Sequence, residues 1–365
     1  MLRPRIKYEH RPVRLGDGHV RIGGALPGVA ATIPDPDGTV WALLVLLDGS
    51  RTVGQAVADL VHHHPDEPPD TVRAAIDTLA AAGYLEDADE PAPEGLTDAD
   101  LERYGRGRAL WRSMDTAPRT TSWHAQLALR RARVTVVGVG GVGSAAALAL
   151  AQSGIGALHL VEPDVVELSN LNRQVLYTEH DLGRPKVDAA IEALRRHNSD
   201  VEITGERTTV DGTGVLRRLA TGCDVLLMGA DTPRAIRSWT NRACLATGTA
   251  WVDGGYRGPR VSVGVFVPGH GRCRECARPA AQARTATPVA FRPGDAWEDG
   301  VHAVNAVSAG IAGLLSAHAV MSLITGIPRL QATRWVTYNL VTLRHAEDDC
   351  EAPDPDCPAC GPAAA

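Results

Sequence analysis

Residues 134–144 read VTVVGVGGVGS, and an Ala- and Leu-rich stretch at 145–152 follows them directly. The apolar run at 134–137 predicts a short strand, and the stretch after the glycines predicts a helix. The glycines permit a tight turn in which backbone N–H groups at the helix N-terminus face a phosphate. The sequence therefore predicts an α/β fold with a phosphate-binding glycine loop containing Gly138, Gly140, Gly141, Gly143 and Ser144.

A second apolar run, 158–161, predicts the next strand, and Glu162 follows it directly. A carboxylate at this position of such a fold meets the ribose hydroxyls of a nucleotide. Up to this point the pattern fits any dinucleotide or mononucleotide binder, an NAD-dependent dehydrogenase included. A glycine-rich turn that binds nothing is the remaining alternative.

Polar and charged residues follow the expected strands, on the side where open α/β sheets bind ligands. The chain reads EPDVVELSNLNRQ at 162–174 and GRPKVD at 183–188, and a third strand at 225–228 leads into Asp231. Two cations with several carboxylates suit a triphosphate with Mg²⁺ better than a nicotinamide dinucleotide. Taken singly, Arg173 fits a surface salt bridge and Asp231 fits a helix N-cap.

Lys186 is expected to open a helix, because Pro185 before it suits a helix start. Only one other lysine, Lys7, occurs in the chain, and Arg supplies the remaining positive charge. The scarcity of lysine favours a chemical role for Lys186, although chance is the alternative.

Residues 101–361 resemble the ThiF/MoeB family of the ubiquitin-activating-enzyme superfamily. The resemblance implies a Rossmann-like core in which a C-terminal carboxylate attacks the α-phosphate of ATP, giving an acyl-adenylate and pyrophosphate. It implies that Asn170, Arg173 and Lys186 stabilise phosphate charge and that Asp231 holds Mg²⁺, which is the electrostatic positioning that such chemistry needs. It also implies that Glu162, where the family usually has Asp, holds the ribose. The matching positions are the Gly138–Ser144 loop, Glu162, Asp164, Asn170, Arg173, Gln174, Lys186 and Asp231.

Upstream, residues 101–107 read LERYGRG. They resemble the family's Arg-Tyr-x-Arg-Gln segment, whose second Arg enters the partner subunit's site. The resemblance implies a homodimer with Arg106 as this finger, although Gly107 stands where the family has Gln. The alternative is an ordinary amphipathic helix start.

Two Cys-x-x-Cys pairs stand near the C-terminus, formed by Cys273, Cys276, Cys357 and Cys360. Four thiolates without an open position are typical of a structural zinc site, and the arrangement resembles the one in this family. Redox chemistry is the alternative. Cys350 is expected to stay free, and Cys223 and Cys244 are expected to lie in the core.

The segment 277–349 contains no cysteine. Family members that capture the activated carrier as a thioester or persulfide place a cysteine in the crossover loop, here about 278–301. We therefore expect the acyl-adenylate to pass directly to an amine, thiol or amide nucleophile.

Residues 1–90 predict a separate unit with a winged-helix-like α+β layout. Short β-type runs at 19–22 and 29–33 precede an apolar run at 41–47, a helix capped by Thr52 and a helix ended by Gly83. The unit holds eight Arg/Lys against fourteen Asp/Glu, and its net charge of −6 argues against DNA binding.

The run from Leu43 to Leu85 resembles the PqqD-like domains of ribosomal-peptide modification systems. The resemblance implies that a leader peptide adds as a strand beside the wing, with a structural adaptor as the alternative. An acidic linker is expected at 91–100, before an adenylation domain at 101–365.

The composition narrows the class of protein. The 365 residues are 44% apolar with a net charge of −6, which excludes global disorder and argues against nucleic acid as the partner. No apolar signal segment opens the chain, so a cytoplasmic protein is expected. The uncharged stretch 303–327 is long enough to span a bilayer, but its polar residues favour a buried core helix over a membrane span.

The order of the two domains resembles that of the microcin-type peptide adenylyltransferases, which carry a peptide clamp before the same core, and the resemblance implies an enzyme. In this hypothesis the N-terminal unit holds a ribosomal precursor peptide by its leader and the larger domain adenylates a carboxylate of the peptide. One alternative is a non-catalytic partner that delivers peptide to a cyclodehydratase. Another is adenylation of a ubiquitin-like sulfur-carrier protein, which leaves residues 1–90 without a role.

Overall fold

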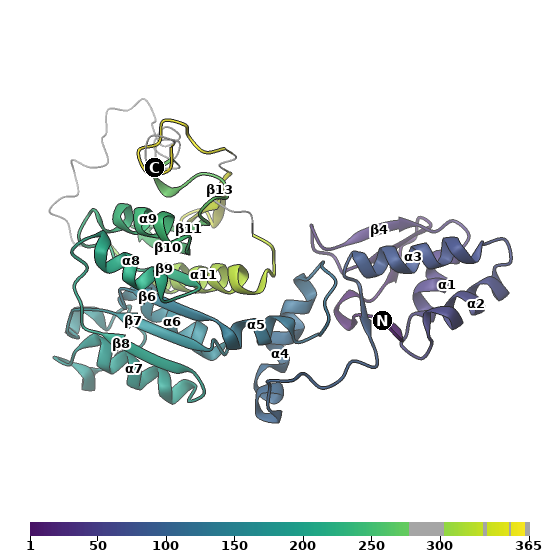
Figure 1. Cartoon of the computed structure of the whole chain (residues 1–365), viewed down its shortest axis with the longest axis horizontal. Helices are drawn as coiled ribbons and strands as arrows, with labels where there is room; N and C mark the ends of the chain where they lie inside the picture. The colour runs from purple at the N-terminus through teal and green to yellow at the C-terminus, as the bar shows by residue number, and fades with distance from the viewer. Residues whose placement is uncertain (277–302, 331–333, 350–351, 362–365) are drawn as a thin grey trace. The chain divides into compact units, whose positions relative to one another are not determined.

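The computed structural model describes residues 1–276, 303–330, 334–349 and 352–361. The chain forms two compact units, Met1–Leu127 and Ala128–Ala365 (Figure 1). The sequence places the start of the larger domain at residue 101, whereas the structure groups residues 101–127 with the N-terminal unit. Helix α5 (His124–Arg131) crosses the boundary between the units.

The N-terminal unit contains two small antiparallel sheets and four helices among its residues 1–127. One sheet pairs β1 with β5, and the other has the strand order β2-β3-β4. Leu44, Leu60, Ile76 and Leu85 are among the apolar side chains that form its core. The elements are β1 (Pro4–Ile6), η1 (Tyr8–His10), β2 (Val13–Arg14), β3 (His19–Ile22), β4 (Ala31–Pro34), α1 (Thr39–Leu46), α2 (Val53–His63), α3 (Pro69–Ala81), β5 (Leu85–Asp87) and α4 (Asp98–Met114).

The expected caps of this unit are confirmed. Thr52 accepts a hydrogen bond from the Gln55 backbone N–H, and the Gln55 side chain accepts one from the Thr52 N–H, which closes a capping box at the start of α2. Gly83 follows α3 with φ +74°, the left-handed conformation that ends helices.

Buried ion pairs hold α4 within the N-terminal unit. The Arg112 guanidinium on α4 donates to Glu9 at 2.9 Å and also to Glu86 in β5. Lys7 donates to the carbonyl oxygen of Asp115, just after α4, at 3.3 Å. Because these side chains are largely buried, removing one partner would leave an uncompensated charge in the interior.

The second unit is built on one large sheet. Among its described residues, eight strands follow the order β13-β12-β11-β10-β9-β6-β7-β8. The five from β10 to β8 run parallel, and β10 to β13 form an antiparallel meander. The strands are β6 (Arg133–Val137), β7 (Ala157–Val161), β8 (Glu202–Glu206), β9 (Val225–Met228), β10 (Ala250–Arg257), β11 (Arg260–Phe266), β12 (Arg334–Asn339) and β13 (Arg344–Asp349).

Helices pack on the sheet in two groups. Helix α6 contacts α7 and α11, whereas α8 contacts α9 (Figure 1). The chain reverses strand order between β8 and β9, and the ends of β6, β7 and β9 near this point carry the polar residues of the sequence patterns. This arrangement is the expected Rossmann-like α/β fold. The helical elements are α6 (Gly141–Gln152), η2 (Leu168–Asn170), η3 (Glu179–Asp181), α7 (Lys186–His197), α8 (Thr213–Thr221), α9 (Ile236–Thr247) and α11 (Ala306–Thr325).

Helix α11 is the described helix that is long and apolar enough to cross a membrane. It packs against α6, β10 and β11, and Ser308, Ser316 and Ser322 are buried along it. Buried polar residues and sheet contacts are typical of a core helix, as the sequence predicts.

The contact between α6 and α11 depends on Gly313. A Cβ at this position would lie 2.5 Å from the Val142 carbonyl oxygen and 2.6 Å from the Ala145 Cβ, whereas a Cβ on Gly310 would meet nothing within 4 Å. We predict that Gly313→Ala lowers the free energy of unfolding by about 1–3 kcal/mol, because the helices must separate.

Gly310→Ala is the matched control and should raise stability by up to about 1 kcal/mol, through helix propensity alone. Chemical denaturation of the two variants checks both values. Equal stability of the variants would contradict the assigned contact.

Candidate active site and metal centre

The glycine loop joins β6 to α6 in a turn that admits no side chain at Gly138 or Gly143. Gly138 has φ +85°, and a Cβ on it would lie 2.6 Å from the Ala230 backbone nitrogen. A Cβ on Gly143 would lie 1.8 Å from the Gly138 carbonyl oxygen. Gly140 and Gly141 start α6, and the buried Ser144 donates its N–H to the Gly140 carbonyl. The first amides of α6 are thereby arranged as in an anion site.

Glu162 lies directly after β7 and holds the glycine loop in shape. Its carboxylate accepts the Val139 backbone N–H at 2.8 Å and the Asp164 N–H at 3.1 Å. Glu162 is buried, whereas the side chain of Asp164 is 66% exposed. The acid expected at a ribose therefore also forms part of the loop's own hydrogen-bond framework.

Lys186 opens α7, as the sequence predicts, and points to the same strand end. Its Nζ lies 3.2 Å from Asp164 Oδ2, and its backbone N–H donates to the Asp164 carbonyl at 2.9 Å. Only 7% of the Lys186 side chain is exposed. A buried ammonium with one exposed carboxylate partner keeps donors for a second anion.

Arg173 and Gln174 lie over the glycine loop. The Arg173 Cγ and Cδ are 3.5 Å from where a Gly141 Cβ would stand, and Gln174 Nε2 is 3.8 Å from the corresponding position on Gly140. Asn170 caps the preceding turn by accepting the Glu167 N–H at 3.1 Å.

Within the described residues, Arg173 Nε and Gln174 Oε1 are buried and make no hydrogen bond. Buried polar atoms of this kind normally have partners, so the two atoms fit a polar ligand held above the loop.

Asp231 and Arg106 differ in their placement. Asp231 is exposed in the loop after β9, and that loop is tied to β6 by hydrogen bonds from the N–H groups of Gly229 and Ala230 to the Val137 carbonyl. Arg106 is exposed on α4 in the N-terminal unit and does not belong to the unit that carries the glycine loop.

Three further residues of this region escaped the sequence analysis. Tyr177 donates its hydroxyl to the Val139 carbonyl at 2.9 Å, and burial raises its pKa. Burial also raises the pKa of Tyr256. The charge of Arg173 and its hydrogen bond lower this pKa, but less strongly than burial raises it. Arg237 pairs with the buried Asp253 at 2.7 Å. Burial lowers the pKa of Arg237, but Asp253 and Asp231 raise it above the usual value.

The four cysteines of the two pairs converge on one point. The Sγ atoms of Cys273 and Cys276 are 3.7 Å apart, those of Cys273 and Cys357 are 3.6 Å apart, and those of Cys276 and Cys360 are 3.3 Å apart. All four lie within 4.8 Å of one another. These separations are too long for disulfides and close to the ~3.8 Å between thiolates that bind Zn²⁺ tetrahedrally at about 2.3 Å. The cluster therefore fits a metal such as zinc.

Hydrogen bonds to the cluster favour thiolates at Cys273 and Cys357, whereas burial raises the pKa of Cys273 and Cys360 above the usual value. Asn241 donates its side-chain amide to Cys273 Sγ at 3.4 Å. Burial raises the pKa of Cys357, but N–H groups of Ala359 and Cys360 lower it below its usual value. Cys244 is buried in the core and Cys223 is half-buried beside it, as expected. Cys350 and the 278–301 segment lie outside the described residues.

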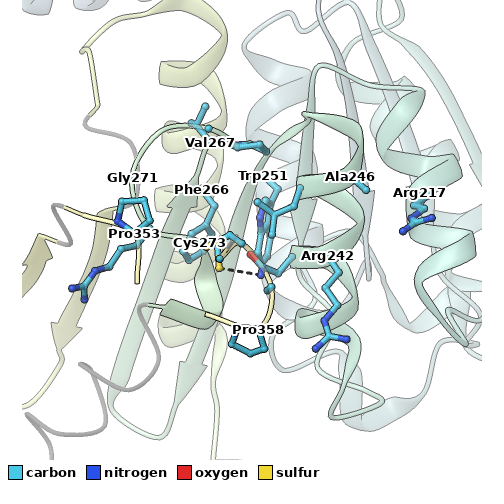
Figure 2. A pocket seen from close by; sticks show the side chains of 18 residues that line it. Arg217, Arg242, Ala246, Trp251, Phe266, Val267, Gly271, Cys273, Pro353 and Pro358 are labelled. Atoms are coloured by element: carbon cyan, nitrogen blue, oxygen red, sulfur yellow. Dashed lines mark hydrogen bonds between the residues drawn. The ribbon is translucent and has the colours of Figure 1, made fainter. Parts of the chain in front are cut away.

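A cavity of about 560 Å³ lies beside the cysteine cluster rather than at the glycine loop. Trp251 and Phe266 contribute to its wall with Cys273, and Arg217 and Arg242 lie on one side of it (Figure 2). The dashed line in Figure 2 is the Asn241 hydrogen bond to Cys273. None of the candidate ATP-site residues lines this cavity.

Comparison with known proteins identifies the family of the chain. The ThiF family model matches residues 113–359. Protein HesA of Leptolyngbya boryana is 32% identical over 73% of this chain and 87% of its own length. Molybdopterin-synthase adenylyltransferase of Escherichia coli is 30% identical over 73% of this chain and 98% of its own length.

Solved structures of E. coli MccB share the fold of the whole chain. The structure of MccB with ATP has a TM-score of 0.74 at 20% identity and covers 98% of this chain and 99% of that one. The structure of the microcin C7 biosynthetic enzyme MccB with N-formylated MccA has a TM-score of 0.75 with the same coverage. The family match spans more than half of the chain, and close relatives in it are adenylyltransferases by name. The chain therefore belongs to the ThiF family and is an adenylyltransferase.

Proposed function

We propose that the chain adenylates a carboxylate of a ribosomally made precursor peptide, using ATP and Mg²⁺, in the cytoplasm. The carboxylate oxygen bonds to the α-phosphorus of ATP, the bond to the β-phosphate breaks, and acyl-AMP and pyrophosphate are the products. The observation that carries the proposal is how much of the chain the structural likeness to MccB covers. The MccB structure covers 98% of the chain, whereas the sequence alignment with the molybdopterin-synthase enzyme takes in 98% of that enzyme but 73% of this chain.

In this proposal the glycine loop and the N-terminus of α6 bind phosphate, and Ser144 completes the turn. Arg173 and Lys186 offset the negative charge that moves onto pyrophosphate, and Asn170 and Gln174 orient the nucleotide. Glu162 and Asp164 hold the ribose. The unpartnered Arg173 Nε and Gln174 Oε1 support this placement of the ligand. Mg²⁺ is assigned to Asp231, which is exposed at the neighbouring strand end.

Two further parts of the proposal rest on the N-terminal unit. A leader peptide adds as a strand to the open edge of β4, since β4 pairs with β3 on one side and with no other strand of the described residues on the other. Arg106 enters the site of a partner subunit in a homodimer, a role supported by its exposure on α4. A non-catalytic delivery partner is the alternative, and retention of Lys186, Arg173 and Asp231 argues against it.

Lys186→Ala should lower ATP–pyrophosphate exchange by about two orders of magnitude, because a preorganised cation is lost where charge develops. Peptide affinity should stay unchanged, since Lys186 lies outside the N-terminal unit. Exchange assays with candidate peptides and a separate peptide-binding titration check the two values. Unchanged exchange in this variant would remove the phosphate role.

Thr32→Pro in β4 should raise the peptide Kd by about tenfold, because proline removes a donor from the edge that receives the leader. Arg14→Pro in β2, where the N–H faces away from β3 at the other edge of the same sheet, is the matched control and should leave the Kd near the wild-type value. Fluorescence anisotropy with a labelled leader peptide measures both. Equal effects of the two prolines would exclude the β4 edge as the binding site.

The cysteine cluster is assigned a structural Zn²⁺. Elemental analysis should give about one zinc per chain, and Cys276→Ser should abolish it and lower the Tm by roughly 10 °C. Cys223→Ser, which changes a half-buried cysteine outside the cluster, should keep the zinc. A zinc content that is equal in both variants would contradict the assignment.

A further inference from the structure

Asp253 in β10 is an acid shared by two arginines. Its Oδ1 accepts the Arg237 Nε–H at 2.7 Å and its Oδ2 accepts the Arg274 Nε–H at 2.7 Å. Only 3% of Asp253 is exposed. Both carboxylate oxygens are thus engaged in charge-assisted bonds within the interior, where such bonds are strong and directional.

Arg274 connects this acid to the cysteine cluster. It lies between Cys273 and Cys276, and its backbone N–H donates to Asn241 Oδ1 at 3.1 Å. Asn241 in turn donates to Cys273 Sγ. Four thiolates around Zn²⁺ carry a net double negative charge. Arg274 is the cation in the turn between two of these cysteines, and its side chain pairs with Asp253.

Arg237 connects the same acid to the nucleotide site. Its Nη2 lies 3.4 Å from the position of a Gly255 Cβ, and Asp231 is close enough to raise its pKa. Tyr256, the next residue along β10, also lies close enough to Arg173 and Asp231 for both charges to shift its pKa. Charges therefore alternate in sign from the cluster through Arg274, Asp253 and Arg237 to Asp231.

We propose that Asp253 is a positioning residue that couples the metal cluster to the nucleotide site through Arg274 and Arg237. The coupling rests on the proposed ATP function. Loss of zinc frees the turn between Cys273 and Cys276 on which Arg274 is held, so Arg274 no longer fixes the Asp253 carboxylate. Arg237 and the Asp231 loop then lose their fixed partner. Because coupling between two binding sites is reciprocal, bound Mg-ATP in turn slows the loss of zinc.

The experiment follows zinc release from the full-length holoprotein to a chromogenic chelator, with and without Mg-ATP. In the wild type, Mg-ATP should slow release by about fivefold or more, and Arg274→Gln should abolish this difference. Calorimetry on the metal-loaded proteins should show weaker Mg-ATP binding in Asp253→Asn than in the wild type.

Arg242→Gln is the matched control. Arg242 lies on α9 and is 54% exposed, and it pairs at 3.5 Å with Glu275 of the same Cys-x-x-Cys turn rather than with Asp253. This variant should keep the effect of Mg-ATP on zinc release.

A wild-type protein that binds Mg-ATP and releases zinc at the same rate with and without it would overturn the coupling. This comparison needs no variant, so the result holds even where Arg274→Gln fails to fold. Persistence of the effect in a folded Arg274→Gln variant would also overturn it. A wild-type protein that shows no Mg-ATP binding by calorimetry would instead overturn the proposed function, and the coupling with it.

Discussion

The second unit is organised by a close approach of backbone segments that only glycine permits. Gly138, Gly143 and Gly229 bring the ends of β6 and β9 and the start of α6 within contact distance, and a Cβ on Gly143 would overlap the Gly138 carbonyl oxygen. The buried Glu162 carboxylate then accepts the Val139 N–H and fixes the turn. The start of α6 is consequently held in place, Arg173 and Gln174 lie beside it, and Lys186 is held at Asp164 after β7.

Features set by local sequence were predictable. The glycine loop, the strand before it and the helix start at Lys186 each follow from residue types at fixed spacing, and the structure confirms these elements. The buried contacts of Tyr177 and Arg237 were not predictable. Tyr177 reaches Val139 across 38 residues, and Arg237 pairs with Asp253 in a different element, so no local pattern contains either contact.

The cysteines and α4 also combine a local pattern that was predictable with distant contacts that were not. Two Cys-x-x-Cys pairs indicate a metal site, but the meeting of Cys273 with Cys357 depends on how the chain folds between them. The grouping of α4 with the N-terminal unit depends on Arg112. Nothing in the sequence distinguishes this arginine from the many others in the chain. Its burial against Glu9 and Glu86 explains why residues 101–127 belong to that unit.

The N-terminal unit favours adenylation of a peptide over adenylation of a ubiquitin-like carrier protein. The E. coli molybdopterin-synthase adenylyltransferase aligns with 73% of this chain over 98% of its own length. It therefore has little that corresponds to the remaining quarter of this chain. An enzyme acting on a folded carrier recognises that carrier's surface, whereas a short flexible peptide loses much conformational entropy on binding and gains from a preformed strand edge. The β2-β3-β4 sheet offers such an edge, and tethering a peptide through it would raise the effective concentration of a distant peptide carboxylate. A peptide substrate thus gives a physical role to both units, whereas a carrier protein gives one to the second unit alone.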